Sequence, residues 1–257
     1  MLRFLVPPSV GVARAQARGE LLERSLSSDL GDRVQVEVAP DYATFERVAR
    51  EAGAELLWAP AAICAHVADD ARAVFKVVRA GRSTYRSALI ARADAHVGIA
   101  QLAGKRAAWV DRRSIGGYLL VAQHLRERGI DPDRTFASQD FVGTHPAALA
   151  AVIEDRADVA AVSVASGESE HVEQALSLHG GRAGATRLAP ILITDTAPTD
   201  ALVITPALDV IRAEALIERI FPPAGGRERT TALKLAMEAD GFERAADGEY
   251  ARLKKLG

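Results

Sequence analysis

The chain has 257 residues, of which 49% are hydrophobic and 26% are charged, and its formal net charge is −2. This length allows one large domain or two lobes with cores of their own. The near-neutral charge argues against a partner such as nucleic acid or an anionic membrane surface. The single cysteine, Cys64, excludes an intrachain disulfide, and no segment approaches the ~18 apolar residues of a transmembrane helix.

The first third of the chain predicts alternating strands and helices. The segment VQVEV alternates apolar and polar residues, which is typical of a half-buried strand. Gly31 follows a run of leucines at helical spacing, as a helix-ending glycine does, and Asp41 is placed to cap the next helix. We expect strands at 2–6, 34–38 and 55–58, and helices at 19–30, 42–53 and 60–68.

The middle of the chain continues the alternation. Two extended runs come first, and a short helical segment opened by Asp94 follows them. The helix after the next strand has leucines on one face and stops at Gly129. We expect strands at 74–79, 86–92, 106–110 and 158–163, a further strand directly before Gly143, and helices at 117–128 and 146–154.

The last third predicts a helix at 168–178, strands at 188–194 and 201–204, and helical structure from Pro206 to the end, broken near 222–226. Strands that alternate with helices indicate an α/β fold with mostly parallel sheets. The pattern βαβαβ occurs twice, in 2–60 and in 106–163, which favours two lobes over one sheet. A cleft between lobes is a favoured place for a small ligand.

Two helix starts are candidates for anion binding. The turn Ser114-Ile115-Gly116-Gly117 lies between a strand and a helix, and Gly143-Thr144-His145 precedes another helix. A helix N-terminus offers unpaired backbone N–H groups and a partial positive charge, and glycine lets the backbone approach a ligand closely. We expect both starts to face one cleft, where the hydroxyl of Ser114 and the imidazole of His145 can also bind an oxyanion.

Six segments, in chain order, resemble phosphonate/phosphite-type substrate-binding proteins, the receptor components of ABC importers. They are LLERSLSSDLGDRVQVEVAPDYATFERVAREAGAELLWAP, RSTYRSALIAR, VDRRSIGGYL, GTHPAALAAVIEDRADVAA, APTDALVI and GFERAADGEYARLKKL. The resemblance implies a two-lobed periplasmic-binding-protein-like fold. Each lobe would be a mostly parallel sheet flanked by helices, and two hinge strands would join the lobes. Lobe one would comprise 1–87 and 195–257, lobe two 88–194, with the ligand cleft between them.

The resemblance also implies the ligand-binding residues. In the family, two tyrosines, a Ser/Thr-rich turn, a histidine and an aspartate contact the ligand, and the aspartate faces a ligand amine. The matching residues are Tyr42, Tyr85, Ser114, Ile115, Gly116, His145 and Asp200. The turn departs from the usual Ser-Thr-Ser-Gly and loses two hydroxyl donors, each worth roughly 0.5–1.5 kcal/mol. The ligand is therefore expected to be phosphonate-like or another small anion or zwitterion.

Residues outside this set receive other interpretations. We expect Trp58 to belong to the core more than to the cleft, and Cys64 to be a buried apolar residue. Arginines near the expected cleft can bind anions in a bidentate manner, although most surface arginines are solvated. These are Arg82, Arg86, Arg112 and Arg113.

No catalytic set is recognisable. The motifs of serine hydrolases, zinc proteases and P-loop enzymes do not occur, and the 6 histidines lack metal-ligand spacing. We therefore expect solute capture by hinge closure, with no cofactor or metal, for an ABC permease as partner. Two alternatives remain open, namely an enzyme on the same bilobal fold and a cytoplasmic ligand sensor.

The N-terminal segment MLRFLVPPSVG is too short for a signal peptide and is interpreted as the first strand. We expect a cytoplasmic location for the chain as it stands, and a periplasmic one if Met1 is not the native start.

Overall fold

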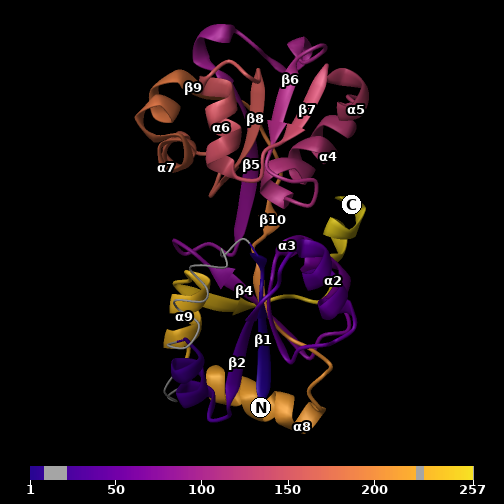
Figure 1. Ribbon diagram of the computed structural model, residues 1–257, viewed down its shortest axis with the longest axis vertical. Coiled ribbons are helices and arrows are strands. Elements are labelled where there is room, and N and C mark those ends of the chain that lie inside the picture. Colours follow the sequence, from indigo (N-terminus) through magenta and orange to yellow (C-terminus); the bar gives the residue numbers. More distant parts are fainter. Residues whose placement is uncertain (9–21, 224–228, 257) are drawn as a thin grey trace. The chain divides into compact units, whose positions relative to one another are not determined.

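A computed structural model describes residues 1–8, 22–223 and 229–256. The chain divides into two compact units, and its main crossings between them follow Ser83 and Ala197. The first unit comprises Met1–Ser83 and Pro198–Lys254, and the second comprises Thr84–Ala197 with the last residues from Lys255 onward. Each unit is built on one sheet with helices on its faces (Figure 1).

The sheet of the first unit has six strands in the order β12-β4-β11-β3-β1-β2. The strands β1, β2 and β3 are parallel, whereas β11 is antiparallel to both of its neighbours and β12 is antiparallel to β4. The edge strand β2 is buried on one face only, while the interior strand β11 is buried throughout. The strands are β1 (Leu2–Val6), β2 (Val34–Val38), β3 (Leu56–Ala59), β4 (Ala73–Val78), β11 (Ala201–Ile204) and β12 (Gly241–Arg244).

Helices cover both faces of this sheet (Figure 1). Leu2 and Phe4 of β1 point into a core shared with Leu26, Leu216 and Leu233, which come from helical residues 22–30 and from the two C-terminal helices. The other face is covered by two helices, of which the first is capped by a backbone N–H donating to the Asp41 carboxylate at 2.7 Å. The remaining helices of this unit are α2 (Tyr42–Arg50), α3 (Ala61–Val67), α8 (Val210–Ile220) and α9 (Thr231–Met237).

The sheet of the second unit also has six strands, in the order β10-β5-β8-β6-β7, with β9 additionally paired to β5. The strands β6, β7 and β8 are parallel, whereas β5 is antiparallel to β8 and to β9. The parallel strands therefore end together at one edge, where loops lead into helices. The strands are β5 (Thr84–Arg92), β6 (Arg106–Trp109), β7 (Ser138–Phe141), β8 (Val159–Val164), β9 (Leu188–Ile193) and β10 (Ala197–Pro198).

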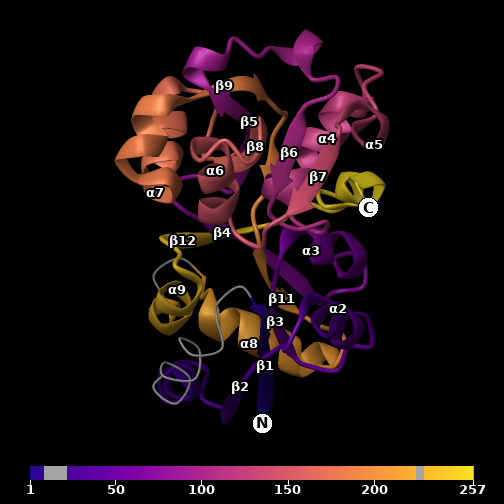
Figure 2. The same cartoon turned by 45° about the horizontal axis from the view of Figure 1, so that its top comes forward.

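Helices α6 and α7 lie on one face of the second sheet, and α4 and α5 lie on the other (Figure 2). The core of the first face joins Leu149 of α6 and Leu176 of α7 to Val162 of β8. Trp109 packs against Tyr118 on the opposite face, with ring centroids 5.4 Å apart. The helical segments are a π-helical turn (Ile115–Leu119) that continues into α4 (Leu120–Arg126), then α5 (Pro132–Thr135), α6 (His145–Ile153) and α7 (Ser169–Arg187).

The α/β fold and both βαβαβ segments are confirmed, since β1–β3 and β6–β8 form two parallel triplets. The sheets are nevertheless mixed and not mostly parallel, because β5 and β11 are inserted antiparallel. The prediction of helical structure from Pro206 to the end is wrong, because β12 follows α9 and pairs with β4. Two predictions lie partly outside the described residues. They are the helix expected at 19–30, for residues 19–21, and the break expected near 222–226, for residues 224–226.

Candidate ligand-binding site

The turn at Ser114 begins a helix in the second unit, as predicted. The side chain of Ser114 accepts a hydrogen bond from the backbone N–H of Gly117 at 3.0 Å. The first intrahelical bond runs from the Leu119 N–H to the Ser114 carbonyl at 2.9 Å, which gives the wide π register. The N–H groups before it can be met only by caps, water or a ligand. The Ile115 side chain is buried, so any contact of this residue with a ligand would come from its backbone N–H.

The two glycines of this turn are required by close packing. A Cβ on Gly116 would lie 2.0 Å from Oγ of Ser163 and 3.0 Å from Cε2 of Tyr85. A Cβ on Gly117 would lie 2.4 Å from Cγ2 of Val110. The turn therefore rests directly on the ends of β8 and β5, and a side chain at Gly116 would displace the serine hydroxyl.

Ser87 fixes the orientation of the turn from the neighbouring sheet. This fully buried residue of β5 donates its hydroxyl to the carbonyl of Gly116 at 2.6 Å. Its backbone N–H donates to the hydroxyl of Thr194 at 3.0 Å, so the serine is held from both sides. The Gly116 carbonyl consequently points into the sheet, and the glycine peptides keep one orientation.

Ser163, at the end of β8, lies between the two helix starts. Its hydroxyl is 3.4 Å from Nε2 of His145, the first residue of α6, and it faces the Gly116 backbone of the other helix start. The start of α6 is capped by Thr144, whose hydroxyl accepts from the Ala147 N–H at 3.2 Å. The second unit thus brings Tyr85, the Ser114 turn and His145 together around one hydroxyl.

His145 is electrically neutral at physiological pH. Burial, reinforced by the neighbouring His179, lowers its pKa from 6.5 to about 4. The two imidazole rings lie 5.1 Å apart, centroid to centroid. Nδ1 of His145 is buried and has no hydrogen-bond partner. The helix starts, and not a charged histidine, therefore supply the positive potential here.

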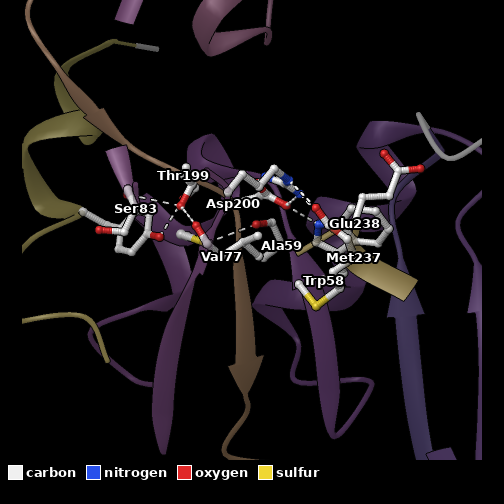
Figure 3. Close-up of polar contacts among 11 residues, drawn as sticks. Trp58, Ala59, Val77, Ser83, Thr199, Asp200, Met237 and Glu238 are labelled. Carbon is white, nitrogen blue, oxygen red and sulfur yellow. Dashed lines mark hydrogen bonds and ion pairs between the residues drawn. The ribbon is translucent and has the colours of Figure 1, made fainter. Parts of the chain in front are cut away.

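Asp200 lies in the first unit, immediately before β11, and its carboxylate is already paired (Figure 3). The Arg79 guanidinium donates to both of its oxygens, at 2.6 and 3.0 Å, and the indole N–H of Trp58 also donates to it. Trp58 packs against the core of its unit, as predicted, and also forms this polar contact. Tyr42, the first residue of α2, is half-buried in the same unit.

The other residues considered from the sequence have ordinary surroundings. Arg86 donates to the Thr194 carbonyl at 2.6 Å, and the Arg112 guanidinium lies 4.4 Å from the centre of the Phe141 ring. Arg82 and Arg113 are exposed. Cys64 is buried, as predicted, and burial raises the pKa of its thiol.

The described residues contain no cluster of three or more His, Cys, Asp or Glu side chains that could hold a metal ion. Within the same ranges, no helix is both long enough and apolar enough to pass through a bilayer.

Three contacts were not predicted from the sequence. Ser87 and Ser163 stand inside apolar strand runs, where a small serine resembles a core residue. Ser163 was detectable by its place near the carboxyl end of a strand, where α/β sheets bind ligands. The pairing of Arg79 with Asp200 joins residues 121 positions apart and depends on the β4–β11 pairing, so no local pattern indicates it.

The fold, with its two α/β units, is that of bilobal periplasmic binding proteins. The sequence matches the family described as ABC transporter, phosphonate, periplasmic substrate-binding protein over residues 4–250. The chain belongs to this family, and its role is to bind a solute for an ABC transporter. That role implies a small ligand and a permease partner.

Solved structures share the fold at low sequence identity. A binding protein component of an ABC phosphonate transporter from Pseudomonas aeruginosa has a TM-score of 0.72 at 22% identity, covering 99% of this chain and 84% of that one. PhnD1 from Prochlorococcus marinus, in complex with methylphosphonate, has a TM-score of 0.72 at 16% identity over 100% and 96% of the two chains. XAC2383 from Xanthomonas citri, bound to ATP, has a TM-score of 0.76 at 18% identity over 99% and 94%.

Proposed function

We propose that this protein captures a small phosphonate-like oxyanion at the junction of the two helix starts in the second unit. The observation that carries the proposal is the position of Ser163, whose hydroxyl adjoins both the Gly116 turn and His145. An anion placed there meets backbone N–H groups at two helix N-termini, where negative charge is stabilised. The serine hydroxyl and one imidazole nitrogen add side-chain donors.

Ser163 also compensates for the departure of the turn from Ser-Thr-Ser-Gly. The turn has lost two hydroxyls, but a hydroxyl from β8 stands against its backbone at Gly116. Because a hydrogen bond to a charged group contributes about 1.5–3 kcal/mol, this one donor can restore part of the stabilisation that the turn has lost. We infer that the Ser-Ile-Gly-Gly turn is compatible with phosphonate binding.

The remaining expectations form part of the same proposal. Tyr85 would line the anion site, since its ring is close to Gly116. We propose, from the family resemblance, that Tyr42 and Asp200 of the first unit also contact the ligand and that domain closure makes the loaded form recognisable to the permease. Capture for import would take place in the periplasm. PhnD1, which shares the fold, was solved with methylphosphonate, and this supports the ligand class.

A ligand panel tests the proposal. Thermal unfolding of the full chain is followed with methylphosphonate, phosphite, phosphate, sulfate, acetate and ATP, the last because XAC2383 was solved with it. A ligand at 100 times its dissociation constant stabilises by about 2.7 kcal/mol, which is readily visible as a rise in Tm. We expect phosphonate or phosphite to give the largest shift. A shift by ATP alone, or by none of the oxyanions, would refute the phosphonate assignment.

Ser114→Ala tests the turn, but it also removes a helix cap worth about 1 kcal/mol. Asp209→Ala is the matched control, because Asp209 caps α8 in the first unit by accepting from the Arg212 N–H at 2.9 Å. Both variants should unfold at lower temperature than the wild type. Only Ser114→Ala should reduce the shift produced by the phosphonate.

A further inference from the structure

One carboxylate occurs among the candidate ligand-binding residues, that of Asp200. An ammonium group on a zwitterionic ligand needs such a carboxylate as its counter-charge. Both oxygens of Asp200 are already engaged by Arg79, at 2.6 and 3.0 Å, in the bidentate geometry that arginine and carboxylate groups favour. Figure 3 shows the same carboxylate facing the indole of Trp58.

The Arg79 guanidinium is itself fixed in place. It donates to the carbonyl of Met237 at 2.7 Å and to that of Glu238 at 3.0 Å, at the C-terminal end of α9. Carbonyl groups at a helix C-terminus attract a cation. Burial lowers the pKa of Arg79, but the hydrogen bonds and charge of Asp200 raise it, and the net pKa lies above the usual value. The cation is thus permanent.

The charge of the aspartate is therefore balanced within the protein. A ligand ammonium brought to Asp200 would meet a neutralised carboxylate and a fixed positive charge. It would have to displace the guanidinium from four hydrogen bonds to Asp200, Met237 and Glu238. A ligand without an ammonium needs no such rearrangement.

We propose that Arg79 is a specificity-determining residue, which selects phosphonates without an amine over aminoalkylphosphonates by occupying Asp200. This inference rests on the proposed function, because it assumes that Asp200 belongs to the ligand site. It narrows the expected ligand from anions and zwitterions to plain oxyanions such as alkylphosphonates.

The test is calorimetric titration of the full chain with ethylphosphonate and with 2-aminoethylphosphonate, two probes that differ by one amine. We expect the wild type to bind ethylphosphonate about tenfold more tightly or better, the order of effect of one nearby unit charge. Equal binding, or tighter binding of 2-aminoethylphosphonate, would overturn the inference and leave the proposed function standing. If neither probe bound, the proposed function would be contradicted, and the inference that rests on it would fail as well.

Two variants separate charge from structure. Arg79→Gln removes the charge and releases Asp200. The ratio of the affinity for ethylphosphonate to that for 2-aminoethylphosphonate should therefore fall about tenfold. Arg79→Lys retains a cation and should keep the wild-type preference. A structural role alone would change stability in both variants while leaving the ratio of affinities untouched, and that result contradicts the proposal. The wild-type titration decides the case even if either variant fails to fold.

Discussion

At the scale of the single residue, the imidazole of His145 illustrates how burial sets chemistry. Its Nδ1 is enclosed without a partner, and Nε2 faces the Ser163 hydroxyl. A neutral imidazole can donate one hydrogen bond to an oxyanion, and its other nitrogen acts as an acceptor. In the proposed site, the contribution of the histidine to binding at neutral pH would therefore depend on its orientation and not on its charge.

The lowered pKa of His145 predicts a pH dependence of stability. The unfolded chain takes up the proton below pH 6.5, whereas the folded chain resists protonation down to a pKa of about 4. The unfolded state thus binds more protons in this window, and stability is lost as pH falls from 6.5 toward 4. For this half-buried group the loss is on the order of 2 kcal/mol.

Urea unfolding of wild type and His145→Asn at several pH values measures this effect. The variant should lose less stability than the wild type between pH 6.5 and 4, because it lacks this titrating imidazole. The exposed His96, replaced by Asn, serves as the control and should retain the wild-type slope. Parallel curves for wild type and His145→Asn would show that the imidazole is not held neutral.

At the scale of the element, the π-helical turn Ile115–Leu119 depends on the absence of side chains at its glycines. Gly117→Ala would place a methyl group 2.4 Å from Cγ2 and 2.5 Å from Cβ of Val110. Overpacking of this kind costs about 1–3 kcal/mol, which exceeds the ~1 kcal/mol that Ala gains over Gly in a helix. We expect a net loss of about 1 kcal/mol and weaker ligand binding.

Chemical denaturation of Gly117→Ala measures the loss. Gly167→Ala provides the comparison, because the nearest atom to its added Cβ would be Cγ2 of Ile193, at an ordinary 3.7 Å. This second variant should be close to wild type in stability. Equal stabilities for Gly117→Ala and the wild type would mean that the turn has room for a side chain.

Strong local sequence signals explain which elements could be predicted. The apolar runs of β1 and β8 and the capped helix α2 carry clear local signals. By contrast, β7 has the polar sequence SQDF at a sheet edge, and β12 has the sequence GFER with one apolar side chain. Both are strands because they complete hydrogen-bond ladders with distant segments, which outweighs local preference.

The site was partly predictable for a related reason. Ser114 and His145 each stand two residues from a glycine and at a helix start, so their sequence neighbours point to an anion site. Ser87 and Ser163 become partners through the register of β5 on β8, where the two serines are directly opposed. Such a long-range pairing has no signature in either strand alone.

At the scale of the whole molecule, the chain belongs to a family of substrate-binding proteins of ABC transporters. We propose that the permease distinguishes the loaded from the empty form. A change in conformation on binding is the usual means. We expect the radius of gyration of the chain in solution to fall when methylphosphonate saturates it. Small-angle X-ray scattering with and without the ligand measures this change, with acetate as the inert control. An unchanged value at saturation would argue against domain closure.

The central claim is that the hydroxyl of Ser163 joins two helix starts into one oxyanion site. Calorimetric titration of methylphosphonate into wild type, Ser163→Ala and Ser138→Ala tests it most directly, since Ser138 is an exposed serine on β7 of the same unit. We predict saturable binding to the wild type and to Ser138→Ala. In Ser163→Ala the affinity should fall about tenfold or more, because a hydrogen bond to a charged ligand is lost. Equal affinities in all three proteins, or no binding to the wild type, would contradict the account.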